Sequence, residues 1–334
     1  SPWNYPLSTP LAEIFLGLIA GNAIVLKPSD VTGLVNEHIQ KIVDSMELPQ
    51  GLFTMIEGRG DVGAALAAAK VDRIVVTGSV ATGRKVMATA SSNLTPVTLE
   101  LGGKDSMIIC DDANIDVASS AAVVGCCFNA GQTCCSVERL LVHENIAEPF
   151  MKAVKDKMAK LRQSETKGFD NDLGPITFDG QKKVYAHQVA DLKQQGGQAL
   201  IGEADYKDGN FMKPLVVKAS DKIEFWNEET FGPVMAYRTF KSDEEAIEIN
   251  NSSVFGLTAM IFSKNNARAK AMARKLHVGS VVINDAPFTN AVSALPWGGV
   301  GDSGFGRVHG EEGLKELCHA RLITYDIGGQ QKQF

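Results

Sequence analysis

The most constraining feature of the sequence is the regular alternation of strand and helix patterns over about its first hundred residues. Short apolar runs rich in β-branched residues, such as residues 22–27 (NAIVLK) and 73–77 (RIVVT), are each followed by a turn and a segment of helical periodicity. Repeated βα units with short connections predict a parallel sheet covered by helices on both faces. The predicted strands are residues 22–27, 52–56, 73–77 and 96–101, and the predicted helices are residues 32–46, 61–70 and 82–90.

A second α/β pattern follows and predicts a second domain. The chain has 334 residues, which is more than a single hydrophobic core usually holds. No strand precedes the one at 22–27, so the first sheet is expected to have an unfilled position, as in an incomplete copy of a larger fold. The later strand patterns are residues 106–110, 139–142 and 278–284, and the later helix patterns are residues 115–128, 147–162, 244–250 and 267–276.

The composition excludes several classes of protein. Lys and Arg number 33 against 39 Asp and Glu, and the net charge of −6 argues against a protein that binds the nucleic-acid backbone. The most apolar stretch, residues 11–26, is interrupted by Glu13 and by small or polar residues, so no membrane span is expected. Six Cys without CxxC spacing or clustered His predict reduced thiols, a cytoplasmic compartment and no metal site.

Two segments contain residues that could react. In residues 131–135 (GQTCC), Cys134 follows a Gly-containing turn and could be exposed at the foot of a cleft, where a backbone N–H would hold an oxyanion. Cys134 and Cys135 could equally be buried small hydrophobic residues. In residues 99–104 (LELGGK), Glu100 ends an apolar strand. It suits a general base with a raised pKa, or an edge-strand carboxylate that faces water.

Other segments suit a nucleotide. Residues 77–84 (TGSVATGR) lead from a strand into a helix whose free N–H groups suit a phosphate, although a capped helix without a ligand explains the pattern as well. Lys27 and Asp30 follow another strand and could bracket a ribose or lie in a solvated turn. Residues 227–233 (NEETFGP) place a carboxylate near an aromatic ring, and residues 297–307 (WGGVGDSGFGR) predict a shaped loop at a functional site or a domain crossover.

Taken together, these segments resemble the aldehyde dehydrogenase superfamily. The motifs SPWNYP, KPSD, TGS, LELGGK, FNAGQTC, EETFGPV and WGGVGDSGFGR occur in the family's order along the whole chain. The resemblance implies an α/β fold with a Rossmann-type parallel-sheet cofactor domain and a second α/β catalytic domain. It divides the chain into a cofactor domain at 1–102, a catalytic domain at 103–304, and a return to the cofactor domain with an oligomerisation strand at 305–334.

The resemblance also implies a chemistry. Cys134 resembles the family's nucleophile, Glu100 its general base and Asn4 the side-chain donor of its oxyanion hole. An aldehyde would add to the Cys134 thiolate, and loss of hydride to NAD would leave a thioester for water activated by Glu100 to hydrolyse. The implied cofactor contacts are Trp3, Lys27, Ser29, Asp30, Gly60, Thr77, Gly78, Ser79, Leu101, Glu229 and Phe231, and the implied aldehyde tunnel is lined by Tyr5, Phe128, Thr133 and Cys135.

The same resemblance carries expectations about the cofactor, the assembly and the compartment. A carboxylate at Asp30 would accept hydrogen bonds from ribose hydroxyls and repel a 2′-phosphate, which favours NAD and leaves NADP as the alternative. Family members have a further segment before the PWN motif, and without it one sheet edge is open and an organelle address stays undetermined. A homodimer or homotetramer is expected, with residues 321–327 (RLITYDI) as a strand that pairs across the dimer.

Two other functions remain open from the sequence. One is a catalytically silent fragment that acts as a binding or structural protein. The other is a hydrolase that forms a thioester at Cys134 and uses no cofactor, because the same Cys, Asn and Glu could cleave esters.

Overall fold

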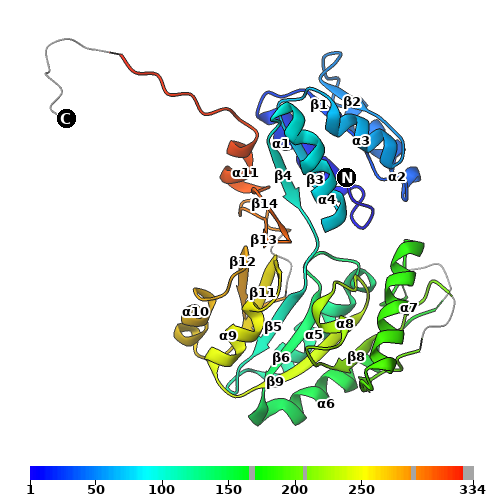
Figure 1. The fold of residues 1–334 in the computed structure, drawn as a ribbon, viewed down its shortest axis with the longest axis vertical. Coiled ribbons are helices and arrows are strands. Elements are labelled where there is room, and N and C mark those ends of the chain that lie inside the picture. Colours follow the sequence, from blue (N-terminus) through cyan, green and yellow to red (C-terminus); the bar gives the residue numbers. More distant parts are fainter. Residues whose placement is uncertain (165–169, 206–208, 287–290, 326–334) are drawn as a thin grey trace, which may run out of the picture.

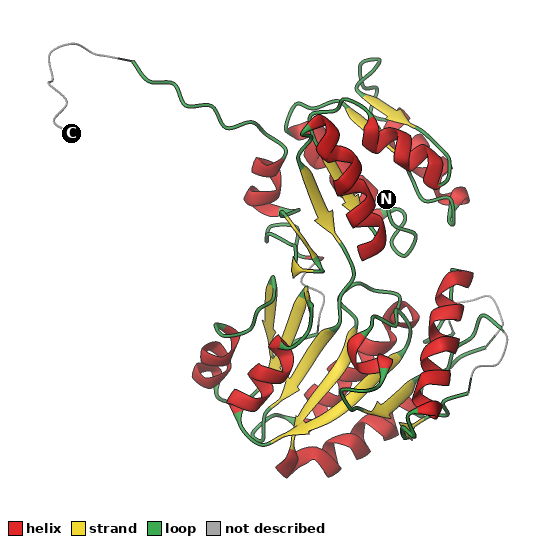
Figure 2. Ribbon diagram, in the orientation of Figure 1, coloured by secondary structure: helices red, strands yellow, loops and turns green. Residues whose placement is uncertain are grey.

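The computed structural model describes residues 1–164, 170–205, 209–286 and 291–325, which form two lobes joined by the connection between β4 and β5 (Figure 1). Helices and strands alternate in both lobes (Figure 2). The first lobe begins with α1 (Ser8–Ile19), β1 (Ile24–Leu26), α2 (Gly33–Asp44), β2 (Phe53–Met55), α3 (Gly60–Ala68), β3 (Ile74–Thr77), α4 (Val80–Ala90), a 3-10 turn (Ser91–Asn93) and β4 (Val97–Glu100).

The second lobe contains most of the remaining elements. They are β5 (Asp105–Ile109), α5 (Ile115–Cys127), 3-10 turns at Phe128–Gly131 and Glu144–Ile146 around β6 (Val137–His143), α6 (Ala147–Met158), α7 (Asp179–Gln194), β7 (Ala199–Ile201), β8 (Leu215–Lys218), α8 (Glu224–Asn227), β9 (Val234–Phe240), α9 (Asp243–Asn251), β10 (Phe255–Gly256), β11 (Thr258–Phe262), α10 (Asn266–Ala273) and β12 (Ser280–Ile283). The chain then passes through β13 (Val300–Gly301), β14 (Gly304–Phe305) and α11 (Gly310–Glu316).

The strands of the first lobe form two small sheets. β1 pairs with β2 and β3 pairs with β4, both in parallel, which confirms the predicted parallel pairing. The prediction of one sheet is wrong for the described residues, because β2 and β3 belong to separate sheets and β14 joins β4 in the antiparallel direction. β1 to β4 are only three or four residues long, so each pair is joined by few ladder hydrogen bonds.

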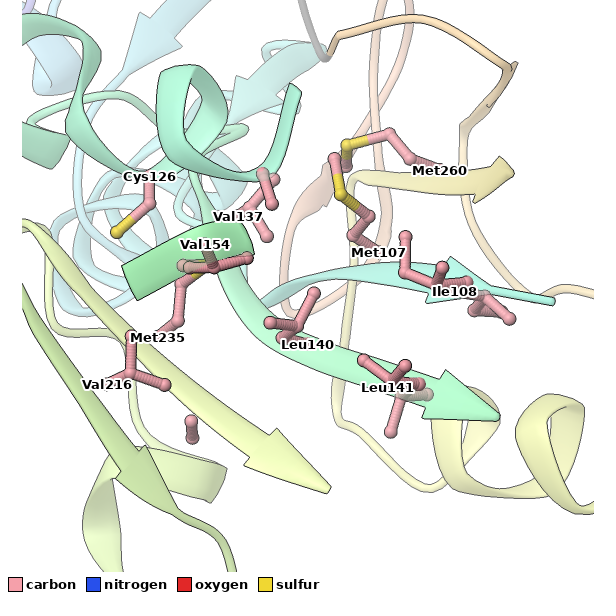
Figure 3. Close-up of a cluster of buried hydrophobic side chains, with 14 of the residues drawn as sticks. Met107, Ile108, Cys126, Val137, Leu140, Leu141, Val154, Val216, Met235 and Met260 are labelled. Carbon is pink, nitrogen blue, oxygen red and sulfur yellow. The ribbon is translucent and has the colours of Figure 1, made fainter. Parts of the chain in front are cut away.

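The second lobe is built on a seven-stranded sheet in the order β12-β11-β5-β6-β9-β8-β7, in which β7 alone runs antiparallel to its neighbour. Every residue of β5, β6 and β11 is buried, as expected of parallel strands covered on both faces. Side chains of β5 and β6, such as Met107 and Leu140, belong to one buried hydrophobic cluster with Val154 of α6 and Cys126 of α5, and Met107 lies beside Met260 of β11 (Figure 3). This core holds the strands whose ends carry the site.

The glycine-rich segment crosses from one lobe to the other. β13 pairs with β10 of the second lobe, and β14 pairs with β4 of the first. Trp297 and Val308 exchange two backbone hydrogen bonds of 2.8 Å across the crossover. Of the two interpretations that the sequence left open, the crossover is therefore correct, and the segment also reaches the cavity described below through Trp297 and Val308.

The largest differences from the sequence-based prediction are α1, α7, β8, β9 and β11, which the sequence analysis did not identify. In α1 the apolar pattern contains Gly17, which disfavours a helix in isolation. Residues 321–325 form no strand and are strongly exposed, since they pair with no described strand, and the rest of the predicted 321–327 strand lies outside the described residues. None of the described helices is both long and apolar enough to cross a membrane.

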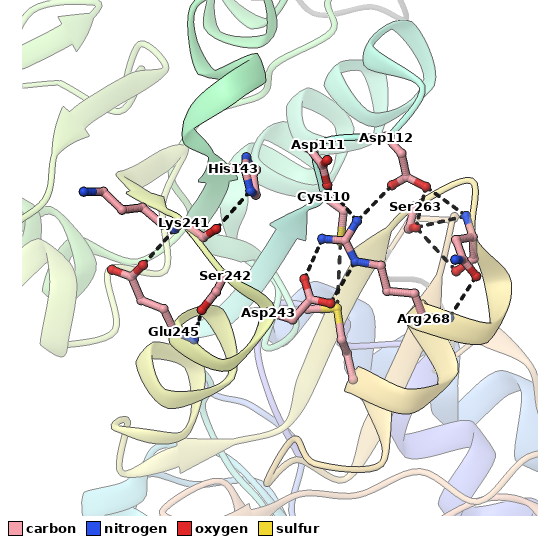
Figure 4. Close-up of polar contacts among 12 residues, drawn as sticks. Cys110, Asp111, Asp112, His143, Lys241, Ser242, Asp243, Glu245, Ser263 and Arg268 are labelled. Atoms are coloured by element: carbon pink, nitrogen blue, oxygen red, sulfur yellow. Dashed lines mark hydrogen bonds and ion pairs between the residues drawn. The ribbon is translucent and has the colours of Figure 1, made fainter.

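An ion-pair network lies at the carboxyl end of β5 in the seven-stranded sheet (Figure 4). Arg268 of α10 donates to Asp111, which follows β5, at 2.7 Å and to Asp243 of α9 at 2.6 Å. These bonds hold the pKa of Asp111 below its usual value. β5 ends at this network, and none of Asp111, Asp243 and Arg268 is among the described residues that line the cavity between the lobes.

Candidate active site

A cavity of about 1180 Å³ lies between the two lobes. From the first lobe it receives the carboxyl ends of β1, β3 and β4, and from the second lobe the segments that precede β6 and β9. The predicted site residues that line it are Trp3, Asn4, Tyr5, Lys27, Ser29, Asp30, Thr77, Gly78, Ser79, Glu100, Leu101, Phe128, Cys134, Glu229 and Phe231.

Three predicted residues are not among the described residues that line this cavity. Gly60 is the first residue of α3 and is exposed elsewhere on the first lobe. Thr133 and Cys135 are buried beside Cys134, where they form the wall behind the nucleophile. Cys135 packs with Leu257, Trp297 and Val308, so the interpretation of a buried small hydrophobic residue is correct for Cys135.

Cys134 is held at the cavity by a tight turn that ends α5. Asn129 and Ala130 both adopt positive φ angles, of 51° and 55°. The side chain of Gln132 donates to the Asn129 carbonyl at 3.0 Å and accepts from the Thr177 N–H at 2.8 Å, which fixes the turn from within the second lobe. Unlike Cys135, Cys134 is partly exposed and lines the cavity.

The surroundings of Cys134 favour its thiolate. A hydrogen bond from the Cys135 thiol lowers the pKa of Cys134, and the backbone N–H groups of both residues act in the same direction, while burial opposes them. The pKa of the Cys135 thiol is raised, since it donates that hydrogen bond and is fully buried. A thiolate is the reactive form of Cys, so Cys134 has the properties of a nucleophile.

Glu100 ends β4 and is only 5% exposed, which excludes an edge-strand carboxylate facing water. Neither of its carboxylate oxygens has a hydrogen-bond partner among the described residues. Burial raises the pKa of Glu100 to about 9, and the charges of Cys134 and Glu13 add to the effect, while Arg307 and Trp297 oppose it. A buried carboxyl group that lines the same cavity as a thiol with a lowered pKa can take a proton from water when it is ionised.

The two glycines of LELGGK allow three parts of the site to touch. A Cβ on Gly102 would overlap the carboxylate oxygens of Glu229, and a Cβ on Gly103 would overlap the carbonyl oxygen of Cys134. The Gly103 N–H donates to Glu229 at 2.9 Å. The connection from β4 to β5 therefore lies directly against both the nucleophile and the cofactor-facing carboxylate that the sequence analysis proposed.

Asn4 and Tyr5 are tied to the nucleophile turn from the first lobe. The Asn4 side-chain amide donates to the Gln132 carbonyl at 3.0 Å, and the Asn129 amide donates to the Asn4 carbonyl at 3.2 Å. The Tyr5 hydroxyl lies 2.8 Å from the Thr133 hydroxyl, and burial raises the pKa of Tyr5 to about 12. Because an amide nitrogen has two hydrogens, Asn4 keeps one that can reach a ligand.

The N-terminus of α4 opens into the cavity through Thr77, Gly78, Ser79 and Thr82. Ser79 caps the helix, because its Oγ accepts from the Thr82 N–H at 3.2 Å. The interpretation of a capped helix is therefore correct, and the helix also presents its positive end to the cavity. Next to it, Lys27 pairs with Asp30 at 3.9 Å, and the Lys27 ammonium donates to the Pro28 carbonyl at 2.9 Å.

The turn before β9 brings Glu229 and Phe231 to the opposite wall. Burial raises the pKa of Glu229 to about 8, with a further contribution from the charge of Glu138. The ring of Phe231 meets the ring of Trp3 edge-on at 5.3 Å, and Trp3 also contacts Phe178 at 5.9 Å. Among the described residues, no group of three or more His, Cys, Asp or Glu is arranged to hold a metal ion.

The chain is similar to known proteins over nearly its whole length. A sequence profile described as the aldehyde dehydrogenase family matches residues 1–323. The chain belongs to the aldehyde dehydrogenase family. It is 36% identical over 338 residues to a chloroplastic betaine aldehyde dehydrogenase of Beta vulgaris, with 99% of this chain and 67% of the relative covered. It is 38% identical to the 4,4'-diapolycopene aldehyde oxidase of Methylomonas sp, with 96% and 60% covered.

Solved aldehyde dehydrogenase structures are similar over nearly the whole chain. A betaine aldehyde dehydrogenase from Staphylococcus aureus in complex with NAD+ has a TM-score of 0.89 at 35% identity, with 95% of this chain and 64% of that chain covered. A lactaldehyde dehydrogenase has a TM-score of 0.92 at 33% identity, with 96% and 68% covered. The chain thus spans about two thirds of the length of the curated aldehyde dehydrogenases that it matches.

Sequence reasoning missed one acidic residue of this aldehyde dehydrogenase site. Glu13 of α1 lines the cavity, burial raises its pKa to about 7, and its charge raises the pKa of Glu100. The sequence did contain a signal for Glu13, because it is a carboxylate inside the most apolar stretch, residues 11–26. The sequence analysis used it only to exclude a membrane span. Trp297, Phe178 and Gln181 also line the cavity and were not predicted.

Proposed function

We propose that this chain carries the cofactor and catalytic sites of an NAD(P)-dependent aldehyde dehydrogenase that oxidises an aldehyde to its carboxylic acid. The observation that carries the proposal is the pair Cys134 and Glu100. A partly exposed thiol with a lowered pKa and a buried carboxyl group with a raised pKa line one cavity. Membership of the family and relatives named as aldehyde dehydrogenases support it further.

The first step in this proposal is the attack of the Cys134 thiolate on the aldehyde carbon. The aldehyde oxygen then becomes an oxyanion, which the free hydrogen of the Asn4 amide and the backbone N–H of Cys134 would hold. One such donor is worth about 3 kcal/mol of transition-state stabilisation. The hydrogen bond from Asn4 to Gln132 fixes the amide in its orientation before substrate arrives, which is the preorganisation that such stabilisation requires.

In a later step of this proposal, Glu100 is the base that activates water. In its ionised form it would take a proton from the water that attacks the thioester at Cys134, and the acid is released. Since the carboxylate is buried among apolar surroundings, its raised pKa makes it a strong base. Phe128 and Tyr5, which line the cavity beside Cys134, would guide the aldehyde, with Thr133 and Cys135 behind them.

The residues present fit a dinucleotide. The cavity is large, the positive end of α4 faces it, and Glu229 and Phe231 stand at its opposite wall beside Cys134. In this proposal Gly78 and Ser79 contact the pyrophosphate, Lys27 and Asp30 the adenosine ribose, and Glu229 and Phe231 the nicotinamide ribose and ring. NAD bound there would accept the hydride, and NADP is the alternative that the Asp30 carboxylate disfavours.

The remaining proposals concern the organisation of the chain. Residues 1–102 would form the cofactor domain, residues 103–304 the catalytic domain, and residues 305–334 the return to the cofactor domain and an oligomerisation strand. A homodimer or homotetramer is proposed, in which the exposed Leu322, Ile323 and Tyr325 would be covered. Free cysteines throughout the described residues suit a reducing compartment such as the cytoplasm, although several relatives are named as chloroplastic or peroxisomal.

The test is NADH formation by the purified chain, with Cys134→Ala as the control. The panel should contain betaine aldehyde, an aminoaldehyde, lactaldehyde and a long apolar aldehyde, because the relatives are named for substrates of each kind. We expect NADH formation that the substitution abolishes while NADH still binds. NADH formation that survives the substitution would contradict the role of Cys134, and a folded chain that produces none would favour the catalytically silent alternative.

A hydrolase without cofactor is the second candidate, since the Cys134, Asn4 and Glu100 set alone could cleave esters. Ester hydrolysis at equal rates with and without NAD, together with no aldehyde oxidation, would favour it.

A further inference from the structure

The turn that presents Glu229 and Phe231 has a backbone that needs external support. Phe231 adopts a φ of 53°, in the left-handed region that an aromatic residue rarely occupies. Such a conformation persists only where surrounding contacts hold it. The position of the Phe231 ring therefore depends on the contacts that hold the backbone of this turn.

Glu138 of β6 holds the turn through two successive backbone groups. Its Oε2 accepts from the Thr230 N–H at 2.8 Å, and its Oε1 accepts from the Phe231 N–H at 2.8 Å. Glu138 is 2% exposed, so both bonds form away from water. Charge-assisted hydrogen bonds in such surroundings are stronger and shorter than neutral ones.

Lys104 offsets the free-energy cost of burying the Glu138 carboxylate, because its ammonium group pairs with it. Its ammonium group donates to Glu138 Oε2 and lies 3.4 Å from the Thr230 hydroxyl, and it is only 1% exposed. Lys104 directly precedes β5 and follows Gly103, whose N–H holds the Glu229 carboxylate. One short segment therefore contacts Glu229 directly and supports Phe231 through Glu138.

The carbonyl groups of the same turn are also occupied. The side chain of Gln181 in α7 donates to the Thr230 carbonyl, and that of Gln188 donates to the Glu229 carbonyl at 3.2 Å. Two N–H groups of the turn, those of Thr230 and Phe231, and two carbonyls, those of Glu229 and Thr230, are thus held by side chains from other elements.

We propose that Glu138, neutralised by Lys104, is a positioning residue that fixes the turn at 229–231 so that Glu229 and Phe231 face the cofactor. Neither Glu138 nor Lys104 is among the described residues that line the cavity, so both act through the turn. The inference rests on the proposed function, because it concerns how the chain holds NAD.

Glu138→Gln is the direct test, because glutamine keeps the size but can offer only one acceptor to the two N–H groups. We expect the Kd for NADH, measured by its fluorescence, to rise at least 10-fold. Hydrolysis of an activated phenyl ester at Cys134, which needs no cofactor, should stay within 2-fold of wild type. Glu245→Gln is the matched control, since Glu245 also accepts from a backbone N–H, that of Lys241, at 2.7 Å (Figure 4). Lys241 follows β9, whereas the turn precedes this strand.

A second variant covers the case in which Glu138→Gln fails to fold because it leaves the Lys104 ammonium buried and unpaired. The double variant Glu138→Gln with Lys104→Met removes both charges together, which buried ion pairs often tolerate. It should show the same loss of NADH affinity with ester hydrolysis retained.

Two results would overturn the inference. One is an NADH affinity within 2-fold of wild type in a folded variant. The other is a parallel loss of NADH binding and ester hydrolysis, which indicates a general structural role. A wild-type chain that binds no NADH would instead contradict the proposed function, so the two failures are distinguishable.

Discussion

Hydrolysis of the acyl group on Cys134 should accelerate steeply between pH 7 and pH 9, because Glu100 must lose its proton to act as a base. With a pKa of about 9, the ionised fraction 1/(1 + 10^(pKa − pH)) is about 1% at pH 7 and about 50% at pH 9. The rate of the Glu100-dependent step should therefore rise about 50-fold over this range if the pKa stays at that value.

Acylation of Cys134 should make the expected rise in rate smaller. After burial, the charge of the Cys134 thiolate is the largest cause of the raised pKa of Glu100, and acylation removes that charge. The midpoint should then fall below about 9. A midpoint at pH 8 would reduce the expected rise to about 10-fold. The prediction is thus a rise of about 10-fold to about 50-fold.

The assay is hydrolysis of an activated phenyl ester by the protein without cofactor, followed from pH 6 to pH 10. The initial burst of phenolate counts acylated Cys134, and the steady phase reports deacylation, which separates Glu100 from the titration of Cys134. Glu100→Gln should deacylate slowly with no rise over this range. Glu13→Gln should shift the midpoint to lower pH, because the Glu13 charge raises the pKa of Glu100. A wild-type rate that is flat from pH 7 to pH 9, or that rises equally in Glu100→Gln, would refute the reasoning.

Three further predictions follow from the same site. Asn4→Ala should lower kcat/KM for the aldehyde about 10²-fold to 10³-fold by removing an oxyanion donor, with the Kd for NADH unchanged; an unchanged kcat/KM would exclude that role. Gly102→Ala should lower the free energy of unfolding in urea by about 1–3 kcal/mol and weaken NADH binding, because the new Cβ overlaps the Glu229 carboxylate. Gly33→Ala is its control, since no atom lies within 4 Å of a Cβ there. Glu100→Gln should raise the melting temperature more at pH 9 than at pH 5. The folded-state pKa of Glu100, about 9, exceeds the ordinary value of 4.5, so its contribution to stability is complete below pH 4.5 and is lost as the pH rises through 9. A gain that is equal at both values would contradict the raised pKa.

Much of the first lobe could be predicted because its signals are local. The helices α2 and α4 follow strands and have amphipathic or capped patterns within a dozen residues, and Ser79 caps α4 as one interpretation of its sequence held. The segments proposed to hold the nucleophile and the base were recognisable for the same reason, since Cys134 and Glu100 lie in compact motifs. The structure adds that both line one cavity.

The remainder depends on contacts between distant residues. Glu138 looks in the sequence like an isolated charge in a strand, and only the fold brings it to Thr230 and Phe231. The family resemblance implied that Thr133 and Cys135 line the tunnel, but both are buried beside Cys134 and neither is among the described residues that line the cavity. Among the described residues β3 pairs with β4 and not with β2, and the periodicity of the sequence does not encode which strands become neighbours.

The two glycines between β4 and β5 also determine where this site can change. Gly102 and Gly103 leave no room for a methyl group against Glu229 and the Cys134 carbonyl, so the centre of the site tolerates almost no variation in side-chain size. Substitutions should be tolerated better at positions such as Tyr5 and Phe128, whose side chains line the cavity. A library that randomises those positions should yield catalysts for new aldehydes, whereas one that randomises the glycines should yield none.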